Sequence, residues 1–333
     1  MANESEPFMP MTMTRTETAT MKAVCIPAFG GADVLSYDDI PRPEPHEEEV
    51  LIRVHAAGVN PVDWKIREGQ FGPLPLPRVM GADISGVVEA LGPDVHDFYI
   101  GQPVFAYSPY GGGYSEFAIA LAANVAPKPS NVSDVEAAAT PLAALTAWQA
   151  LFDIADLQPG QKVLIHGGAG GVGTFAIQLA HRAGATVVTT AAEGHEAFLR
   201  RLGADQVINY QTTRFDDIVR HVGVVLDLVG GETHDRSWKT LKLGGTFVST
   251  VKLPCQEKAM IRGVRAVKMH TQAKGDQLTL IGDLIASGDL KVVVDKVLPL
   301  SEARHAQELS QLGHSRGKTV LSVDHDACLL AFC

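Results

Sequence analysis

The sequence predicts an α/β protein in which a mainly-β domain is followed by a domain with a doubly wound parallel sheet. Three observations predict it. Residues 21–126 contain many short apolar runs separated by Gly, Pro and Asp, a pattern typical of an all-β domain. Residues 160–288 alternate apolar strands with helical patterns, which favours a parallel sheet covered by helices on both faces. Where this alternation begins, the apolar run 163–165 of a predicted strand gives way to a run of glycines.

The composition is that of an ordinary globular chain. Its 333 residues suggest two domains, with 46% hydrophobic and 20% charged residues. The net charge of −10, with no basic stretch, argues against a nucleic-acid partner, and no apolar run reaches the length of a membrane span. Four scattered cysteines are too few for a disulfide framework, which indicates a reducing compartment and a cytoplasmic protein.

The two ends of the chain are expected to lie outside the fold. Residues 1–20 are polar, with early acidic residues and no apolar core segment, so they predict a disordered tail rather than a secretory signal. Residues 324–333 are expected to form a C-terminal tail.

Short strands fill the first domain, and a helix at 62–68 interrupts them. These strands are expected at 21–29, 49–59, 84–92, 102–108 and 114–120. The sequence pattern changes at 135–152. This segment is rich in Ala and Leu and predicts one helix capped by Ser133.

Beyond this helix, strands and helices alternate. Strands are expected at 162–167, 186–191, 206–210, 224–230, 245–251 and 265–271. Helices are expected at 171–182, 195–202, 215–221, 233–241 and 276–287. A final strand, helix and strand over 291–323 are too short for a core of their own, so we expect them to return to the β domain. The β-rich domain then covers 21–134 and 289–323, and the parallel-sheet domain covers 135–288.

The glycine run predicts what the second domain binds. Gly168, Gly170 and Gly173 fit the pattern G-x-G-x-x-G, with a strand before it and a helix after it. The first glycine permits the tight turn, the second lets the backbone approach a pyrophosphate, and the third lets the helix pack on the strand. Free N–H groups and the positive end of the helix dipole attract phosphates. The turn therefore predicts a dinucleotide held by Gly168, Ala169, Gly170, Gly171, Val172 and Gly173.

Seven segments, together with this order of domains, carry a resemblance to a known superfamily: AAGVNPVDWKIREGQF (56–71), MGADISGVVEALG (80–92), ATPLAALTAWQAL (139–151), GQKVLIHGGAGGVGTFAIQLA (160–180), LGADQVINY (202–210), VLDLVGG (225–231) and HSRGKTVLSV (314–323). They resemble the medium-chain dehydrogenase/reductase superfamily. Within it, the chain is similar to the zinc-independent quinone oxidoreductases of the ζ-crystallin type, over about residues 21–323. The resemblance implies a GroES-like β domain, a Rossmann-type nucleotide domain, a nicotinamide cofactor, a small-molecule substrate and a homodimer, with the strand 245–251 as one candidate edge.

The metal ligands of the superfamily's zinc-dependent members are missing from this sequence. By the resemblance, those members need a Cys near the start of the first helix, a His in a Gly-His-Glu turn, and a third Cys or His. The matching positions here carry Asn60, Ala82–Asp83 and Pro141. The C-x-x-C spacing of a structural zinc lobe also does not occur. We therefore expect no zinc and no other metal site.

Without a Lewis acid, an acceptor that is already electrophilic is favoured. A quinone, or an alkene conjugated to a carbonyl, accepts hydride directly from the nicotinamide and leaves negative charge on its oxygen. The protein then has to hold the two reactants together and offer a hydrogen bond to that oxygen. Two alternatives stay open: reduction of the double bond in enals or acyl thioesters, and a non-catalytic protein that binds NADPH.

Three polar residues are candidates for the reacting end of the site. Asn60 follows a strand at a metal-ligand position of the zinc-bearing relatives, and its amide can donate to substrate or nicotinamide; capping of the following helix is the alternative. Asp63 belongs to the family's N-x-x-D pattern, with complementation of the helix dipole as the alternative. By the resemblance, Thr146 lies close to the nicotinamide, with simple helix packing as the alternative.

A tyrosine is the fourth catalytic candidate. Tyr107, together with Tyr110 and Tyr114, surrounds the run Gly111–Gly113, which is a candidate lining or lid of the substrate cleft. Packing on the β domain is the alternative for each of these rings.

The choice between NADPH and NADH depends on the residues after the second strand of the nucleotide domain. Ala192 stands where NAD-preferring relatives carry an Asp, which leaves room for a 2′-phosphate, and by the resemblance His195 and Tyr210 contact that phosphate. Glu193 has the spacing of a carboxylate that binds the ribose 2′-OH of NADH. We favour NADPH, with NADH possible if Glu193 points into the site.

Overall fold

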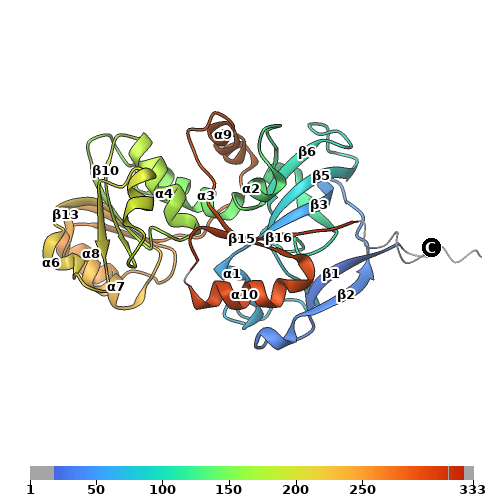
Figure 1. Ribbon diagram of the computed structural model, residues 1–333, viewed down its shortest axis with the longest axis horizontal. Coiled ribbons are helices and arrows are strands. Elements are labelled where there is room, and N and C mark those ends of the chain that lie inside the picture. The colour runs from blue at the N-terminus through green and yellow to red at the C-terminus, as the bar shows by residue number, and fades with distance from the viewer. Residues whose placement is uncertain (1–18, 314, 326–333) are drawn as a thin grey trace, which may run out of the picture.

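The computed structural model describes residues 19–313 and 315–325. The molecule is elongated, with a β-rich domain and a domain of alternating strands and helices side by side (Figure 1). Most of the tail expected at 1–20 lies outside the described residues, and strand β1 already begins at Thr20. Of the tail expected at 324–333, only Asp324 and His325 are described, and the His325 ring bonds the Val54 carbonyl at 2.7 Å.

Two sheets build the β domain. Three strands form one sheet in the order β2-β1-β4, and the larger sheet has the order β15-β16-β3-β5-β6-β8 with β7 also paired to β3. The strands are β1 (Thr20–Ile26), β2 (Ser36–Pro41), β3 (Glu49–Val59), β4 (Arg78–Val79), β5 (Asp83–Leu91), β6 (Pro103–Tyr107), β7 (Phe117–Leu121), β8 (Val125–Pro127), β15 (Val294–Pro299) and β16 (Lys318–Ser322). The helices are α1 (Pro61–Arg67), α10 (Ala303–Leu312) and the 3-10 turns η1 (Ala32–Val34), η2 (Ala122–Asn124) and η4 (Leu300–Glu302).

The second domain confirms the predicted doubly wound parallel sheet. Its order is β11-β10-β9-β12-β13-β14, with every pair parallel, so the chain runs outward from β9 in both directions. The strands are β9 (Lys162–His166), β10 (Thr186–Ala191), β11 (Gln206–Asn209), β12 (Val222–Asp227), β13 (Leu241–Ser249) and β14 (Arg265–Lys268). The helices are α4 (Gly171–Arg182), α5 (Glu196–Arg201), α6 (Phe215–Ile218), α7 (Gly231–Ser237), α8 (Gln256–Arg262) and α9 (Gly275–Ala286).

The prediction of a single continuous helix over 135–152 is wrong. The segment forms α2 (Asp134–Ala138), α3 (Pro141–Trp148) and the π-helical turn η3 (Gln149–Ile154). Pro141 explains the first break, because proline lacks the N–H that would continue a helix and fits best at a helix start. The predicted Ser133 cap is confirmed, since its hydroxyl accepts from the Glu136 N–H at 3.2 Å.

Other sequence expectations also need correction. The strand expected at 245–251 is not a sheet edge, because β13 lies between β12 and β14. Helix α8 and the short strands β2, β4 and β8 were not expected, and they carry only seven residues or fewer each. The helix expected at 233–241 ends at Ser237, and β13 already starts at Leu241.

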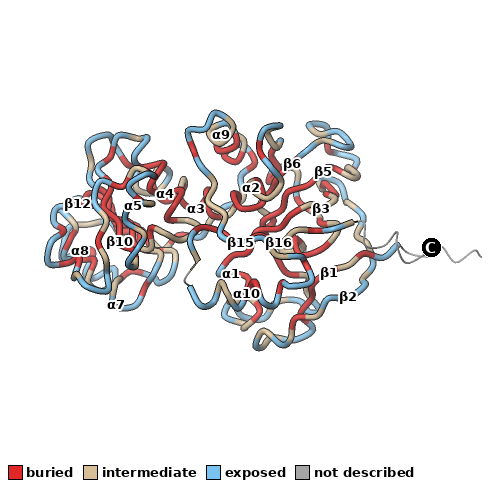
Figure 2. Tube along the Cα trace, in the orientation of Figure 1, coloured by how far each residue is buried: buried red, intermediate tan, exposed pale blue. Residues whose placement is uncertain are grey.

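Strands β15 and β16 and helix α10 pack on the β domain. Strand β16 pairs antiparallel with β3, with Val320 opposite Gly58, and parallel with β15. Helix α10 packs against α1, where the Arg67 side chain, 1% exposed, donates to the Gln307 side chain at 3.0 Å. Figure 2 shows buried chain along the central strands of both domains and through α3 between them. The domain limits 135 and 289 stay a prediction.

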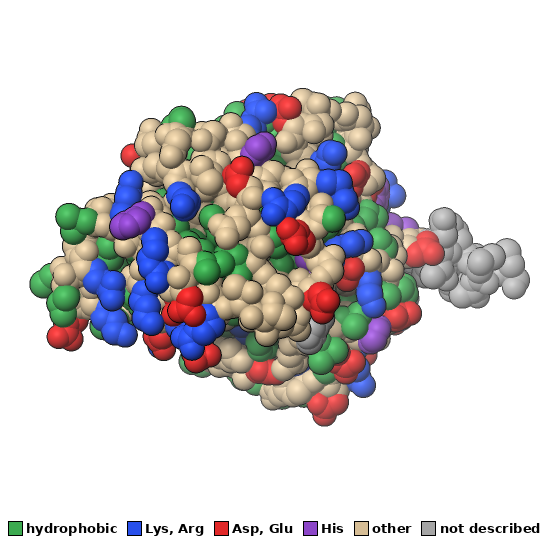
Figure 3. Space-filling view, turned by 60° about the vertical axis from the view of Figure 1, so that its left-hand side comes forward, with side chains coloured by type: hydrophobic (Ala, Val, Ile, Leu, Met, Phe, Trp, Pro, Cys, Tyr) green, Lys and Arg blue, Asp and Glu red, His purple; other side chains and the backbone are tan. Residues whose placement is uncertain are grey.

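The surface carries mixed charge. Figure 3 shows Lys and Arg interspersed with Asp and Glu over the face it presents, with cations most frequent toward the nucleotide domain. Among the described residues, no helix combines the length and apolar character needed to cross a membrane.

Candidate nucleotide and substrate cleft

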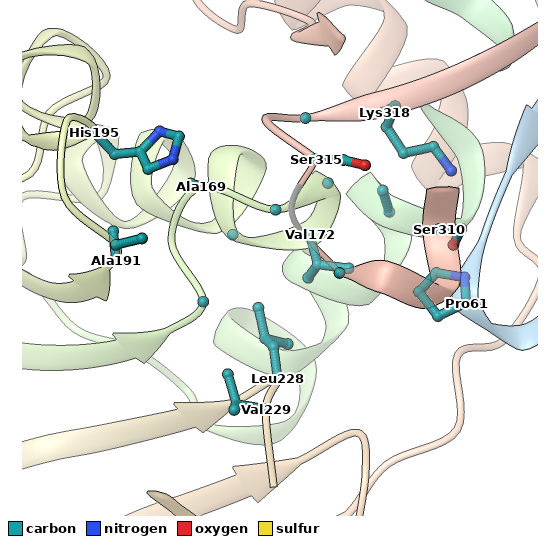
Figure 4. A pocket seen from close by; sticks show the side chains of 18 of the residues that line it. Pro61, Ala169, Val172, Ala191, His195, Leu228, Val229, Ser310, Ser315 and Lys318 are labelled. Carbon is teal, nitrogen blue, oxygen red and sulfur yellow. The ribbon is translucent and has the colours of Figure 1, made fainter. Parts of the chain in front are cut away.

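A cleft of about 530 Å³ lies where the two domains meet (Figure 4). From the nucleotide domain, the turn after β9 and the ends of β10 and β12 line it. The β domain contributes Val59, Asn60 and Pro61 at the end of β3, and the C-terminal part of the chain contributes Ser310, Ser315 and Gly317–Thr319.

The glycine turn has the geometry of a phosphate cradle. A Cβ at Gly168 would lie 2.1 Å from the Thr189 hydroxyl, and a Cβ at Gly173 would lie 2.3 Å from the Gly167 carbonyl, so the protein itself requires both glycines. A Cβ at Gly170 would meet nothing closer than 3.5 Å. The open space above Gly170 is therefore available to a ligand, as the pyrophosphate interpretation requires.

The first turn of α4 faces this space. Gly170 is the N-cap residue and has no side chain to cap the helix, so the N–H groups of Gly171, Val172 and Gly173 have no partner within the helix. Such N–H groups and the positive helix end bind anions. Gly171, Val172, Gly173 and Ala169 all line the cleft, whereas Gly168 lies behind the turn and donates its N–H to the Thr190 carbonyl at 3.1 Å.

The ribose-reading residues lie at the other end of the cleft. Ala192, His195 and Tyr210 line it, and Tyr210 is 57% exposed. The His195 side chain lines the cleft, and its buried Nδ1 atom has no hydrogen-bond partner among the described residues. Glu193 is exposed and absent from the cleft lining, and its backbone N–H donates to the Gln211 side chain at 3.1 Å.

Asn60 lies at the opposite, polar end. Its side chain is 3% exposed and donates to the Asp83 carboxylate at 2.8 Å, while its carbonyl oxygen accepts from the Lys318 ammonium. Lys318 also donates to Asp83 at 3.3 Å and to the Val59 carbonyl at 2.8 Å. Asp83 in turn accepts from the backbone N–H of Leu142 at 2.8 Å. Asn60, Asp83 and the residue beside Pro141 therefore converge at one point.

Asp63 lies behind this cluster, outside the cleft lining. It accepts from the Asn60 backbone N–H at 2.8 Å and from the Tyr114 hydroxyl at 2.7 Å. Burial raises the pKa of Asp63 to about 7, although these hydrogen bonds and the Lys318 charge oppose the rise. Asp63 thus takes part in a capping box at the start of α1, and the Asn60 side chain also bonds Asp83 and Lys318.

The remaining two catalytic candidates lie outside the lining of the cleft. Thr146 is 5% exposed, and its hydroxyl bonds the Leu142 carbonyl and the Thr271 hydroxyl, both at 2.6 Å. Tyr107 packs against the core of the nucleotide domain, and burial raises its pKa. Tyr110, Gly111 and Gly112 line a second cavity of about 500 Å³ on the β domain, so the glycine run does not cover the nucleotide cleft.

The sequence reasoning missed the residue that organises the polar end. The sequence pattern places Lys318 in a strand and assigns it no role. A lysine at the start of the apolar run GKTVLSV does indicate a buried partner, because lysines are rarely buried unless they are paired. Asp83 enters the sequence argument only because it stands in the turn where the zinc-dependent relatives carry a His ligand. Over residues 19–313 and 315–325, no three His, Cys, Asp or Glu side chains gather into a group that could hold a metal ion.

Comparisons with known proteins agree with this architecture. Residues 46–130 match the family model of the alcohol dehydrogenase GroES-like domain, and residues 202–321 match that of the zinc-binding dehydrogenase. The quinone oxidoreductase of Mus musculus is 33% identical over 320 residues, which span 90% of this chain and 96% of the mouse protein.

Two solved structures extend the comparison. The quinone oxidoreductase of Coxiella burnetii superposes with a TM-score of 0.86 at 38% identity, covering 92% of this chain and all of that one. The Escherichia coli quinone oxidoreductase, solved in complex with NADPH, gives a TM-score of 0.84 at 29% identity, covering 90% of this chain and 99% of that one.

The two glycines of the cradle give a matched pair of variants. Gly173→Ala should lower the free energy of unfolding by about 1–3 kcal/mol, because its Cβ has no room against Gly167. Gly170→Ala should leave unfolding within about 1 kcal/mol of wild type but weaken nicotinamide-nucleotide binding about tenfold or more. Urea unfolding and fluorescence titration measure the two effects. Unchanged nucleotide binding by Gly170→Ala would contradict the cradle.

Asp63 should make stability depend on pH. Because its pKa is raised from 3.8 to about 7, the folded state holds a proton that the unfolded state has lost, so stability falls as pH rises across this window. The slope from this group approaches about 1.4 kcal/mol per pH unit. Asp63→Asn, which keeps one acceptor oxygen, should remove that slope in urea unfolding measured from pH 5 to 8. An identical slope in the variant would assign the pH dependence to other groups.

Proposed function

The chain belongs to the medium-chain dehydrogenase/reductase superfamily and, within it, to the ζ-crystallin-like quinone oxidoreductase family, and from this premise we propose that it uses NADPH, without zinc, to reduce a quinone or an α,β-unsaturated carbonyl. The observation that carries the proposal is the cleft. It joins a backbone cradle for phosphates to a polar end organised around the Asn60 amide.

The residues at the polar end support a reaction without zinc. Asn60 and Pro141 stand at metal-ligand positions of the zinc-dependent relatives, and the Lys318 ammonium bonds Asn60 and Asp83 at the point where these positions converge. A divalent cation beside that ammonium would be repelled strongly in a buried site. Without a metal ion, only a hydrogen bond polarises the acceptor's oxygen. This favours an acceptor that is already electrophilic before it binds.

The chain's own residues supply binding and orientation. Bound NADPH supplies the hydride. The turn at Gly170 and the first N–H groups of α4 hold phosphates, and the Asn60 amide donates to the acceptor's oxygen as negative charge develops there. Val59, Leu228 and Val229 give the cleft apolar walls that limit the entry of water.

The preference for NADPH is supported by the ribose end of the cleft. Ala192 is small, and Tyr210 and His195 line the site, where the His195 imidazole is a donor for a 2′-phosphate. Glu193, the residue that favoured NADH, is exposed and lies outside the lining.

We also propose a homodimer and a cytoplasmic location, as the family resemblance implies. Strand β14 is the outer strand of the nucleotide-domain sheet, so it replaces 245–251 as the candidate edge for pairing with a second copy. Met260 and Ile261, on the helix that precedes β14, are 83% and 78% exposed. An exposed apolar patch beside an open strand edge is typical of an interface.

His195 should discriminate between the cofactors. His195→Ala should raise the Kd for NADPH about tenfold, because a charge-assisted hydrogen bond is lost, and leave the Kd for NADH unchanged. Glu193→Ala is the control and should change neither constant in a fluorescence titration. Strong preference of the wild type for NADH, lost in Glu193→Ala, would reverse the cofactor assignment.

The reaction is tested by oxidation of NADPH with a panel of quinones, enones, enals and acyl thioesters. We expect quinones and enones to react fastest, and activity to survive dialysis against a chelator, because no step requires a metal. Loss of activity on chelation would contradict the zinc-free mechanism. Faster turnover of enals or acyl thioesters would favour a double-bond reductase, and NADPH binding without any turnover would favour a non-catalytic protein.

A further inference from the structure

Lys318 places a buried positive charge at the base of the cleft. Its residue is 5% exposed, and its ammonium has three N–H donors, which match the three acceptors around it: the Val59 carbonyl, the Asn60 side-chain oxygen and the Asp83 carboxylate. A buried ammonium is costly unless every donor is paired, and here each one is. The lysine is therefore held in one position and has no donor left for a ligand.

Asp83 is the matching anion. It is fully buried, and its two oxygens accept from the Asn60 side chain, the Leu142 N–H and Lys318. Burial raises the pKa of the Asp83 carboxyl, whereas the Lys318 charge and the N–H donors of Asn60 and Leu142 stabilise its charged form. The two charges balance each other within the cluster.

This pair fixes which way the Asn60 amide faces. The amide oxygen accepts from the Lys318 ammonium, and the amide nitrogen donates to Asp83 at 2.8 Å. A flipped amide would set its N–H₂ group against the ammonium and its oxygen against the carboxylate, and both contacts would be repulsive. An asparagine amide has two N–H bonds, and Asp83 takes one of them. The second N–H is the donor that Asn60, a residue of the cleft lining, retains for a ligand.

Lys318 also ties this end of the cleft to the phosphate cradle. The N–H of the preceding Gly317 donates to the Ala169 carbonyl at 2.8 Å, and Gly317 pairs with Gly170 in a β-bridge. A Cβ at Gly171 would lie 2.7 Å from the Lys318 side-chain Cδ, so the aliphatic stem lies against the first turn of α4. Figure 4 shows Lys318 on this side of the cleft, across from His195.

We propose that Lys318 and Asp83 are positioning residues that lock the Asn60 amide in the orientation that leaves one N–H for the hydride acceptor or the nicotinamide carboxamide. The ammonium takes the central place among positions that carry metal ligands in the zinc-dependent relatives. It acts through Asn60 rather than by touching the substrate. The inference rests on the proposed hydride transfer for its kinetic consequence, and on the structure alone for the orientation of the amide.

The main test variant is Lys318→Met combined with Asp83→Asn. Lys318→Met alone would leave an unpaired buried carboxylate and risks failure to fold, whereas the double variant removes both charges together. Lys296→Met is the matched control, since Lys296 is exposed on the neighbouring strand β15. We expect the double variant to keep its Kd for NADPH within about threefold while kcat falls about tenfold or more, and the control to match wild type.

A double-mutant cycle separates positioning from a general structural effect. Asn60→Leu should lower kcat by itself, and adding Lys318→Met with Asp83→Asn to it should lower kcat by less than about twofold more, because the two changes remove the same donor. Losses that multiply in the combined variant, or a double variant with wild-type kcat, would overturn the proposal.

A measurement without cofactor or substrate tests the orientation independently. In ¹H–¹⁵N spectra of the apo protein, the side-chain amide of Asn60, identified by its loss in Asn60→Leu, should have one proton shifted downfield by the bond to Asp83. That shift should disappear in the double variant and persist in Lys296→Met. An unshifted wild-type signal would overturn the orientation, whereas a shifted signal with no turnover of any acceptor would overturn the proposed function alone.

Discussion

The cleft depends on the way the last strand crosses from one domain to the other. Strand β16 completes the β-domain sheet beside β3, and the glycine before it bonds the phosphate turn of the nucleotide domain. Gly317 has φ of 93°, and a Cβ at this position would lie 2.2 Å from the Val293 carbonyl oxygen. Only glycine therefore fits where the chain passes between the two domains. One short segment thereby sets the spacing between the phosphate cradle and Asn60.

The sequence was sufficient for the parts of the fold with strong periodicity. Helix α4 was predicted with its observed limits and strand β9 to within one residue, because local spacing determines them. The prediction of one continuous helix over 135–152 was wrong. Ala and Leu favour helix on both sides of Pro141, and the prediction followed this composition although a proline interrupts a helix. Short strands such as β2 and β4 carry too few residues for a pattern, and they form because a longer neighbour, β1, offers them partners.

The same distinction between local and long-range features applies to the candidate site. Its cradle is a local motif and could be predicted, whereas its polar end is assembled from β3, β5, the start of α3 and β16, which lie far apart in the sequence. The Thr146 hydroxyl bonds the Leu142 carbonyl and Tyr107 packs against the core, and a catalytic role for either stays a prediction. Which face of an element a side chain occupies at a domain boundary depends on both domains, and no window of sequence contains both.

An ammonium and a metal ion at the same point impose different chemistry. A catalytic metal keeps an open coordination position and polarises the substrate's oxygen by direct contact. The Lys318 ammonium has all its donors engaged within the protein, so it offers a ligand no hydrogen bond of its own and instead orients the amide that can offer one. A single neutral N–H stabilises a developing oxyanion less than a divalent ion does, because the amide carries only a partial charge. Under the proposed function, such a site suits acceptors that delocalise the added charge over a conjugated system.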